Sequence, residues 1–284
     1  GGSKMGLKTD ALLMWSIWRR QKYAKSRGLF IRREITELTK QGAAWDRAQE
    51  ILGRSVIYTQ TDHKITFPNG SVLEFGHCHD ESDKFHYQGA QYDDECFDQL
   101  EQFTDTQYSY IQAACRTPND NPPTDSLGNV IKPRVRCSAN PGDVGHVWVK
   151  AYFIDVSTSG QAYTYTSIID TPDGSKMTVT RDRVFIPASV FDSVKAGIVS
   201  SEYVETLNVL PEPYRSAYLY GLWDVFIGQA FLDFKPMVEG KPYHGIEYEV
   251  LPKVWRRVAG HDWGYDEPCY TLWGALDPLG GIII

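Results

Sequence analysis

The chain opens with GGSKMGLKT, residues 1–9, and this stretch decides which fold is expected for the rest. It is close to the phosphate-binding pattern GxxxxGK followed by Ser or Thr, in which backbone N–H groups converge on phosphate oxygens at the start of a helix. In that pattern a lysine neutralises phosphate charge and the hydroxyl binds Mg²⁺. The residues that could fill these roles are Gly1, Gly2, Gly6, Lys8 and Thr9. The stretch predicts a nucleotide site whose helix begins near Lys8 or Thr9.

Two side chains depart from this pattern. Met5 and Leu7 occupy positions at which phosphate-binding loops favour glycine, because the backbone there often adopts a conformation that side chains disfavour. A glycine-rich turn that only caps the following helix is therefore an equal alternative. The loop alone does not decide between the two.

Helix-like and strand-like segments alternate after the loop, as expected for an α/β fold whose sheet is mostly parallel. The predicted helices cover residues 10–28, 35–53, 105–116, 145–154 and 200–210. The predicted strands cover 29–33, 92–98 and 134–140, and the two runs of 65–76 around Pro-Asn-Gly predict a hairpin. The polar stretch 77–88 predicts a loop.

A second motif lies in the predicted strand at 92–98. Its last residue, Asp98, stands where nucleotide hydrolases have the aspartate that holds the Mg²⁺ water shell. Thr9 and Asp98 are expected to reach the same ion, which places their side chains about 4 to 7 Å apart. Gln99 stands where a glutamate usually orients the attacking water. Because an amide cannot accept a proton from that water, the site is expected to bind nucleotide and to hydrolyse it slowly.

Two charged groups outside this site are interpreted as solvated. Asp93, Asp94 and Glu95 break the apolar run that a central parallel strand should show, which favours a solvated edge or a damaged strand over a second metal site. Arg19 and Arg20 are interpreted as a solvated helix end whose positive charge complements the helix dipole.

Composition limits where the chain works. It has 284 residues and a formal net charge of -7, which neither indicates nor excludes nucleic acid as a partner. The five cysteines form no C-x-x-C pair, which fits a reducing compartment. No apolar run approaches the roughly 20 residues that span a bilayer, and no signal peptide precedes the first glycines. We therefore expect a cytosolic location, and both ends look like cuts in a longer protein.

The order of several sequence blocks resembles the large terminase subunit of tailed bacteriophages. The first glycines resemble the family's phosphate-binding loop, FDQ resembles its FDE, and SANPG resembles the motif that couples ATP hydrolysis to DNA movement. The blocks, in chain order, are GGSKMGLKTDALLMW, FIRRE, FPNGSVLEFG, YQGAQYDDECFDQLEQFTDTQYSYI, SANPGDVGHVWVKAYFI, GLWDVFIGQAF and DWGYDEP.

The resemblance implies two domains. Residues 1–257 would form a terminase ATPase domain, a P-loop NTPase-like, mostly parallel sheet flanked by helices, whose N-terminal strand is missing. Residues 258–284 would be the truncated start of an RNase H-like nuclease domain, beginning with its first strand. The implied ligands are ATP and Mg²⁺, with Mg²⁺ or Mn²⁺ for the nuclease of the intact protein.

The resemblance also implies partners and a place of action. The partners would be double-stranded DNA, the portal protein, the small terminase subunit and further copies of the chain in a homo-oligomeric ring. The implied place is the cytoplasm of the bacterial host, at the portal of the procapsid, with no membrane contact. The implied activity is ATP-driven packaging of viral DNA, joined in the intact protein to DNA cleavage.

For the nucleotide site, the resemblance assigns roles residue by residue. Lys8 would contact phosphate, and Thr9 and Asp98 would hold Mg²⁺. Ser138 and Asn140 would sense the γ-phosphate, and the side chain of Asn140 should point into the crevice that holds Thr9 and Asp98.

Two further residues match catalytic positions of the family. Arg116 matches one arginine of an Arg-x-Arg pair, and Ala114 stands where the other is expected, so an arginine finger is in question. Asp262 matches the first nuclease carboxylate, which would bind a metal ion. A single carboxylate cannot make the two-metal site that such nucleases use, so this chain is not expected to cut DNA.

Two other interpretations stay open. The first is a catalytically impaired prophage remnant that acts at most as a nucleotide- or partner-binding module, and Leu7, Gln99 and Ala114 favour it. The second is an unrelated α/β binding protein with a glycine-rich start, which leaves the ordered matches to chance.

Overall fold

The computed structural model describes residues 1–117, 120–225, 237–238, 241–242, 251–262, 270–278 and 281–283. The chain forms two compact units, Gly1–Gln229 and Ala230–Ile284, and each is described by itself. Much of GLWDVFIGQAF and DWGYDEP, together with Cys269, lies outside the described residues. The expected domain start at 258 falls inside the second unit, in a strand that begins at Arg256.

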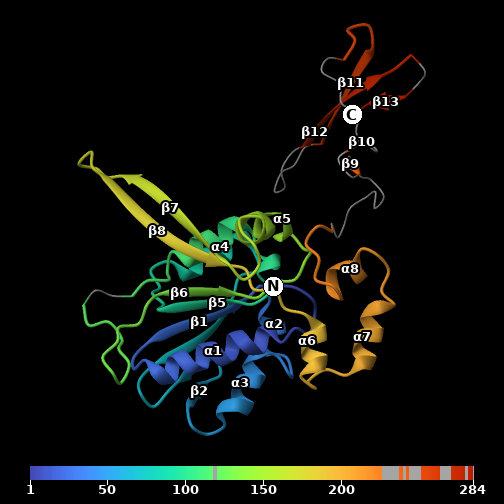
Figure 1. The fold of residues 1–284 in the computed structure, drawn as a ribbon. Coiled ribbons are helices and arrows are strands. Elements are labelled where there is room, and N and C mark those ends of the chain that lie inside the picture. Colours follow the sequence, from blue (N-terminus) through green and yellow to red (C-terminus); the bar gives the residue numbers. More distant parts are fainter. Residues whose placement is uncertain are drawn as a thin grey trace. The chain divides into compact units, whose positions relative to one another are not determined.

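A six-stranded mixed sheet is the centre of the first unit, with the strand order β2-β3-β4-β1-β5-β6 (Figure 1). The strands β4, β1, β5 and β6 are parallel, whereas β2 and β3 form an antiparallel edge. The bounds are β1 (Arg27–Arg32), β2 (Ile57–Thr59), β3 (Lys64–Thr66), β4 (Val72–His77), β5 (Asp94–Phe97) and β6 (Arg134–Cys137). The predicted α/β fold with a mostly parallel sheet is confirmed, as is the hairpin within 65–76, which joins β3 to β4.

Helices cover both faces of this sheet, with α1 and α3 on one face and α4 and α5 on the other (Figure 1). The bounds are α1 (Lys8–Lys22), α2 (Ile35–Thr39), α3 (Ala44–Leu52), α4 (Asp105–Gln112) and α5 (His146–Val149), which continues as one π-helical turn, η3 (Lys150–Ile154). Two short 3₁₀ helices are η1 (Glu81–Tyr87) and η2 (Leu100–Gln102).

Two predicted elements differ from the structure. The helix expected over 35–53 breaks into α2 and α3, because the backbone between them turns through Gly42 at a φ of 76°. The loop expected over 77–88 contains the 3₁₀ helix η1, which begins at a capping box made by the side chains of Asp80 and Asp83. In both places local polar or glycine chemistry decided the outcome.

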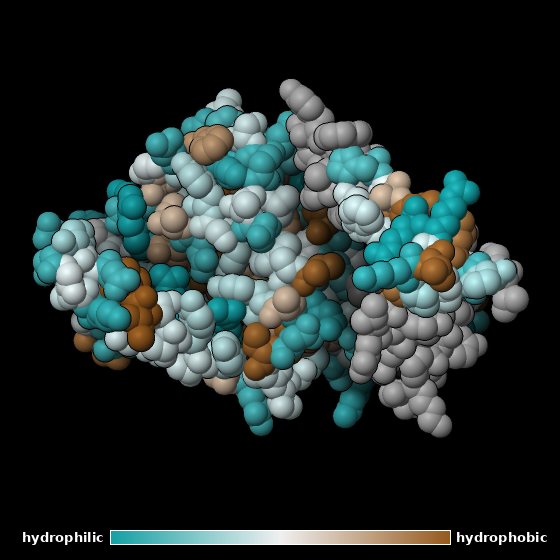
Figure 2. All heavy atoms as spheres, turned by 90° about the horizontal axis from the view of Figure 1, so that it is seen from above, coloured by the Kyte–Doolittle hydropathy of each residue, from teal (hydrophilic) through white to brown (hydrophobic). Residues whose placement is uncertain are grey.

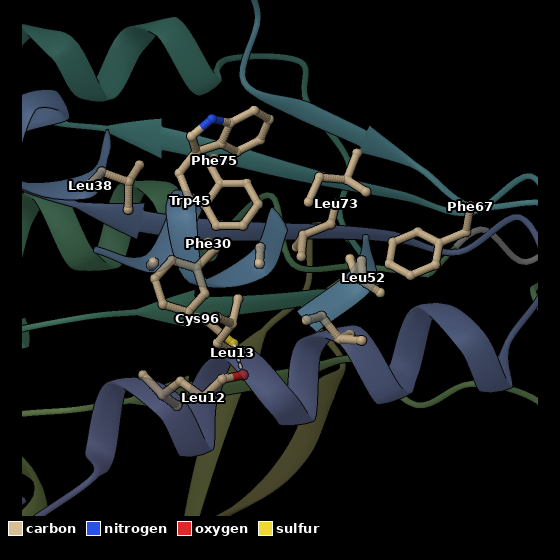
Figure 3. Packing of buried hydrophobic residues seen from close by; sticks show 14 residues of the cluster. Leu12, Leu13, Phe30, Leu38, Trp45, Leu52, Phe67, Leu73, Phe75 and Cys96 are labelled. Atoms are coloured by element: carbon tan, nitrogen blue, oxygen red, sulfur yellow. Dashed lines mark hydrogen bonds between the residues drawn. The ribbon is translucent and has the colours of Figure 1, made fainter. Parts of the chain in front are cut away.

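The core forms on both faces of the sheet because successive strand residues point in opposite directions. Phe30 of β1 packs with Leu13, Trp45 and Phe75 under α1 and α3, as Figure 3 shows. Its neighbours in β1 point to the opposite face, where Leu29 and Ile31 pack with residues of α4 and α5. The sheet is thus buried on both sides, and its strand ends are held in fixed positions.

The rest of the first unit contains a hairpin that the sequence analysis did not predict. It consists of β7 (Ala162–Asp170) and β8 (Lys176–Val184) and extends beyond the sheet in Figure 1. A signal was present, because an Asp-Gly turn at 173–174 separates two runs rich in Thr, Tyr, Ile and Val. Three helices follow with a small core of their own: α6 (Val190–Lys195), α7 (Ser201–Asn208) and α8 (Tyr214–Tyr218).

Exposed apolar side chains are scattered over the surface. Ile168 and Met177 of the hairpin are half exposed or more, and Figure 2 shows apolar side chains as separate patches among hydrophilic ones over the coloured residues of its face. Within the part of the chain that the structure describes, no helix is both long enough and apolar enough to cross a membrane.

The second unit contains short antiparallel strands. A three-stranded sheet has the order β11-β12-β13, and a separate pair joins β9 to β10. The bounds are β9 (Met237–Val238), β10 (Lys241–Pro242), β11 (Arg256–Asp262), β12 (Tyr270–Leu276) and β13 (Ile282–Ile283). A strand that ends at Asp262 was expected and is present.

The charges of Arg19, Arg20 and Asp94 are buried, and the interpretation of these residues as solvated is wrong. β5 is a central strand, and its Asp94 carboxylate faces α1, where it pairs with Nε of Arg19 at 2.8 Å and with Nη2 of Arg20. Gly28 of β1 is opposite Asp94, and a Cβ there would lie 1.8 Å from Nη1 of Arg20. The absent side chain of Gly28 therefore leaves the room that this ion cluster needs.

Removing the carboxylate charge should destabilise the protein strongly. We expect Asp94→Asn to lower the free energy of unfolding by about 3 to 5 kcal/mol, because it leaves two buried guanidinium groups without their counter-ion. Urea unfolding followed by circular dichroism measures this. Glu50→Gln, which disrupts the exposed pair of Glu50 with Arg47, serves as the matched control and should change stability little. Equal losses in the two variants would contradict the ion cluster.

Glu95 is the second buried acid of β5, and it faces the opposite side of the sheet from Asp94. Among the described residues, neither of its carboxyl oxygens has a hydrogen-bond partner. Burial, with a smaller contribution from the charge of Asp94, raises the pKa of Glu95 to about 9. The group is therefore protonated in the folded protein at neutral pH, and Glu95 too is not the solvated residue that was expected.

This raised pKa predicts a pH dependence of stability. An acid whose pKa is higher in the folded than in the unfolded chain stabilises the fold at low pH, and that contribution is lost as pH rises from near 4.5 through about 9. We expect Glu95→Gln to remove this loss, so that the variant gains more than about 1 kcal/mol on the wild type between pH 5.5 and 8.5. Urea unfolding at both pH values measures it, and parallel pH profiles would refute it.

Candidate nucleotide site

The first residues of the chain are held between two other segments of the first unit. The N–H of Gly2 donates to the carbonyl of Ala139, which follows β6, at 3.1 Å. The N–H of Ser3 donates to the carbonyl of Ala188 at 3.0 Å, and the carbonyl of Gly1 accepts from the N–H of Ala188 at 2.7 Å. Gly2 has a φ of 136°, and a Cβ there would lie 2.2 Å from the oxygen of Ala188. This close approach requires glycine and fixes where the loop begins.

The helix after the loop begins at Lys8, as the phosphate-binding pattern predicts. The N–H groups in the first turn of a helix have no intrahelical acceptor, and the helix dipole is positive at that end. Figure 1 places this end of α1 near the chain start and the ends of β5 and β6. A phosphate group at this point would meet the unpaired N–H groups and the positive end of the dipole.

The departures from the glycine pattern are accommodated with backbone strain. Met5 and Leu7 both adopt left-handed conformations, with φ values of 55° and 53°. These are the conformations for which glycine is favoured, so the objection raised by the sequence identifies a real cost. The loop nevertheless keeps its shape, which shows that the surrounding contacts outweigh this cost.

Asp98 lies at the carboxyl end of β5 and joins three parts of the chain. Its Oδ1 accepts from Oγ1 of Thr9 on α1 at 2.8 Å and from Oγ of Ser138, which follows β6, at 2.5 Å. The same Ser138 hydroxyl accepts from the backbone N–H of Gln99 at 2.9 Å. The predicted meeting of Thr9 and Asp98 is present, but the contact is direct and shorter than the 4 to 7 Å expected for two groups that share one ion.

These residues fit a magnesium ion. Asp98 is fully buried, and in the described part of the chain its Oδ2 has no hydrogen-bond partner, although Nε of Arg32 lies 3.7 Å away. A hydroxyl and one carboxylate beside a phosphate-binding loop are what Mg²⁺ uses when nucleotide oxygens and water complete its octahedron. Thr9 and Asp98 would hold the ion, and the ion would neutralise phosphate charge.

The two lysines of the loop have different environments. Burial lowers the pKa of Lys8 to about 8, and its ammonium group donates to the carbonyl of Ser3. The Lys4 ammonium lies over the ring of Tyr218, 3.7 Å from the centroid. Lys8 is therefore folded back on its own loop, in a position from which an incoming phosphate could accept its hydrogen bonds.

Gln99 does not point to open space at the end of the strand. Its Oε1 accepts from Nε of Arg32 at 2.8 Å and also from Nη2 of the same guanidinium. Ile31 pairs with Phe97 in the parallel register of β1 and β5, so Arg32 lies level with Asp98. The sequence analysis missed Arg32, and the signal that could have found it is its position at the end of the strand before β5.

Glu101 is a second residue that the sequence analysis missed. It lies in η2 and is nine-tenths or more buried, and its Oε1 accepts from Nδ2 of Asn140 at 3.0 Å. Burial raises its pKa to about 7. Asn140 thus points to Glu101 rather than directly to Thr9 or Asp98. The spacing of three residues after Asp98 was visible in the sequence, but no rule connected it with the site.

The two remaining predicted residues are not part of this cluster. The N–H of Arg116 donates to the carbonyl of Tyr92, before the start of β5, whereas Asp98 follows its end. Six residues of strand separate Tyr92 from Asp98, about 20 Å at 3.3 Å per residue. Ala114 is buried in the core beside α4. Asp262 ends β11 in the second unit, and its side chain lies outside the described residues.

A shallow hollow adjoins the loop. It has a volume of about 270 Å³, and its wall includes Gly6, Leu7, Ala188 and Asp192. The hollow lies on the side of the loop that faces α6. It offers both backbone groups and apolar side chains to a ligand bound at the start of α1.

The fold is that of phage large terminases. Three solved structures of the large terminase from one thermophilic bacteriophage match this chain: one with no ligand named, one in complex with ADP and one in complex with ATP-gamma-S. Their TM-scores are 0.56, 0.55 and 0.55 at sequence identities of 15%, 16% and 14%. Each match covers 98% of this chain and 58–59% of the terminase chain.

The predicted resemblance is thus confirmed for the fold over nearly the whole chain, which spans about three-fifths of the length of those terminases. No protein-family model matches the sequence, and no curated protein matches it either. At this level of identity the likeness establishes the architecture. Assignment of chemistry depends on the residues described above.

The strain at Leu7 can be measured. We expect Leu7→Gly to leave stability unchanged or to raise it by up to about 1 kcal/mol, because a side chain in the left-handed region costs about 1–2 kcal/mol and glycine loses about 0.5–1 kcal/mol through chain entropy. Met14→Gly, at an exposed position within α1, is the matched control and should lose about 1 kcal/mol. Urea unfolding compares them, and similar losses would show that Leu7 is not strained.

Proposed function

We propose that this chain is the ATPase part of a phage large terminase and that its site binds Mg²⁺ and ATP. The observation that carries the proposal is the contact of Thr9 and Ser138 with the Asp98 carboxylate at the carboxyl ends of β5 and β6. In open α/β sheets this edge is where ligands bind. The start of α1 lies at the same place, so phosphate and metal would meet there.

The proposed binding mode assigns one task to each group. The phosphates lie at the N-terminus of α1, where Lys8 moves from the carbonyl of Ser3 to a phosphate oxygen. Thr9 coordinates Mg²⁺ directly, and Asp98 holds a water of the ion. The nucleoside occupies the hollow beside Leu7. The ADP and ATP-gamma-S complexes of the thermophilic phage terminase support a nucleotide as the ligand of this fold.

The finer assignments rest on the resemblance. Hydrolysis would drive double-stranded DNA into a procapsid in the host cytoplasm, together with the portal protein, the small terminase subunit and further copies of this chain in a ring. The segment from Ser138 to Asn140 would couple hydrolysis to DNA movement. Arg116 lies far from Asp98 within one chain, so a catalytic role for it requires a neighbouring copy. The strand that ends at Asp262 would begin an RNase H-like nuclease.

A second candidate function is a nucleotide- or partner-binding module without turnover. The observation that favours it is the side chain of Gln99, which is engaged by Arg32 and carries no carboxylate. The two candidates agree on binding and differ on hydrolysis. Release of phosphate from ATP separates them, since only the first predicts it.

Binding should depend on Mg²⁺ through Thr9. We expect calorimetric titration with ATP-gamma-S to show binding that Mg²⁺ strengthens, and Thr9→Val to reduce that gain at least about tenfold, a change of about 1.4 kcal/mol. Thr39→Val is the matched control, since the Thr39 hydroxyl donates within α2 at 2.9 Å. Affinity that is the same with and without Mg²⁺ would reject the proposed site.

A further inference from the structure

The sequence leaves the proposed ATPase without a base for the attacking water. The residue after Asp98 is an amide, and its Oε1 is already the acceptor for two donors of Arg32. Gln99 has a left-handed backbone, with a φ of 61° and a ψ of 59°, which the following turn η2 continues. A different carboxylate near Asp98 would have to perform the step.

The turn η2 brings such a carboxylate to the site. The N–H of Leu100 donates to the carbonyl of Ser138 at 2.8 Å, and the carbonyl of Glu101 accepts from the N–H of Gly145 at 2.7 Å. These contacts fix the backbone of the turn on both sides. The Glu101 side chain then accepts from Asn140, in the segment that also supplies Ser138. Glu101 is thus held next to the residues expected to sense the γ-phosphate.

One oxygen of Glu101 is held and the other is available. Asn140 donates to Oε1, whereas Oε2 is buried and, in the described residues, has no hydrogen-bond partner. A buried carboxyl oxygen without a donor is costly unless a ligand or water supplies one. The side chain is also close enough to the loop for its charge to oppose the lowering of the pKa of Lys8 and Lys4 by burial.

We propose that Glu101, three residues after Asp98 rather than one, is the carboxylate that orients and deprotonates the water attacking the γ-phosphate. This inference rests on the proposed ATPase function. The water donates to Oε2 while Asn140 holds Oε1 in place. It replaces the expectation of slow hydrolysis that Gln99 suggested.

The step balances without another reagent. The water oxygen forms a bond to the γ-phosphorus, the bond between that phosphorus and the bridging oxygen of ADP breaks, and the electron pair of the broken bond leaves with ADP. The water proton moves to Glu101 and then to solvent with the released phosphate. Burial raises the pKa of Glu101 to about 7, so the group can accept a proton and release it near neutral pH.

A purely structural role is the alternative. In that case Glu101 would only satisfy Asn140 and stabilise the turn, and its removal would lower stability or nucleotide affinity without a specific loss of turnover. Binding and turnover must therefore be measured separately. Glu101→Gln keeps the shape and can still accept from Asn140, and Glu101→Asp keeps a carboxylate but shortens the side chain.

The test compares four forms of the full chain: wild type, Glu101→Gln, Glu101→Asp and Gln99→Ala. Calorimetry with Mg²⁺ and ATP-gamma-S gives Kd, phosphate release at saturating ATP gives kcat, and circular dichroism checks the fold. We expect Glu101→Gln to lower kcat at least about 100-fold with Kd changed less than about threefold, since a general base contributes about 10² to 10⁴. Glu101→Asp should retain more activity, and Gln99→Ala should change kcat less than about threefold.

The outcomes separate this inference from the proposed function. Tight Mg²⁺-dependent binding and wild-type turnover, retained in folded Glu101→Gln, would overturn the role of Glu101 and leave the ATPase intact. Binding without wild-type turnover would overturn it in favour of the binding module. Absence of binding in the wild type would overturn both the site and the inference.

Discussion

The hydrogen bond from the Thr9 hydroxyl to the Asp98 carboxylate is the contact on which the rest of the site depends. It joins the first turn of α1 to the end of β5, while Ser138 joins the same carboxylate to the segment after β6. Because β5 is central and buried on both faces, the position of Asp98 is fixed by the whole sheet. A loop that starts between Ala139 and Ala188 is thereby aimed at one carboxylate.

The acids in and around β5 show how a buried strand can carry charge. Asp94 faces α1 and is neutralised by two arginines, whereas Glu95 faces the other side and is protonated at neutral pH. Asp98 accepts two hydroxyl hydrogen bonds, and Glu101 is held by Asn140. A buried charge is tolerated only with a partner or by proton uptake, and each residue here uses one of these solutions.

Much of the fold and part of the site could be predicted from sequence. Alternation of helix and strand patterns indicated the parallel sheet, and the GGSKMGLKT motif placed the start of α1. The partners of Asp94 could not be found, because Arg19 and Arg20 at a helix end look solvated until the helix is packed on the strand. Glu101 was missed for a similar reason, since only the turn η2 and Asn140 bring it to the site.

The central claim is that Thr9 and Asp98 bind one metal ion beside a nucleotide. A crystal of the chain grown with ATP-gamma-S and Mn²⁺ in place of Mg²⁺ tests it most directly, because anomalous scattering locates the ion. The account predicts a manganese peak about 2.1 Å from Oγ1 of Thr9 and one water away from Asp98, with the phosphates at the start of α1. A peak away from both side chains, or nucleotide bound elsewhere, would contradict it.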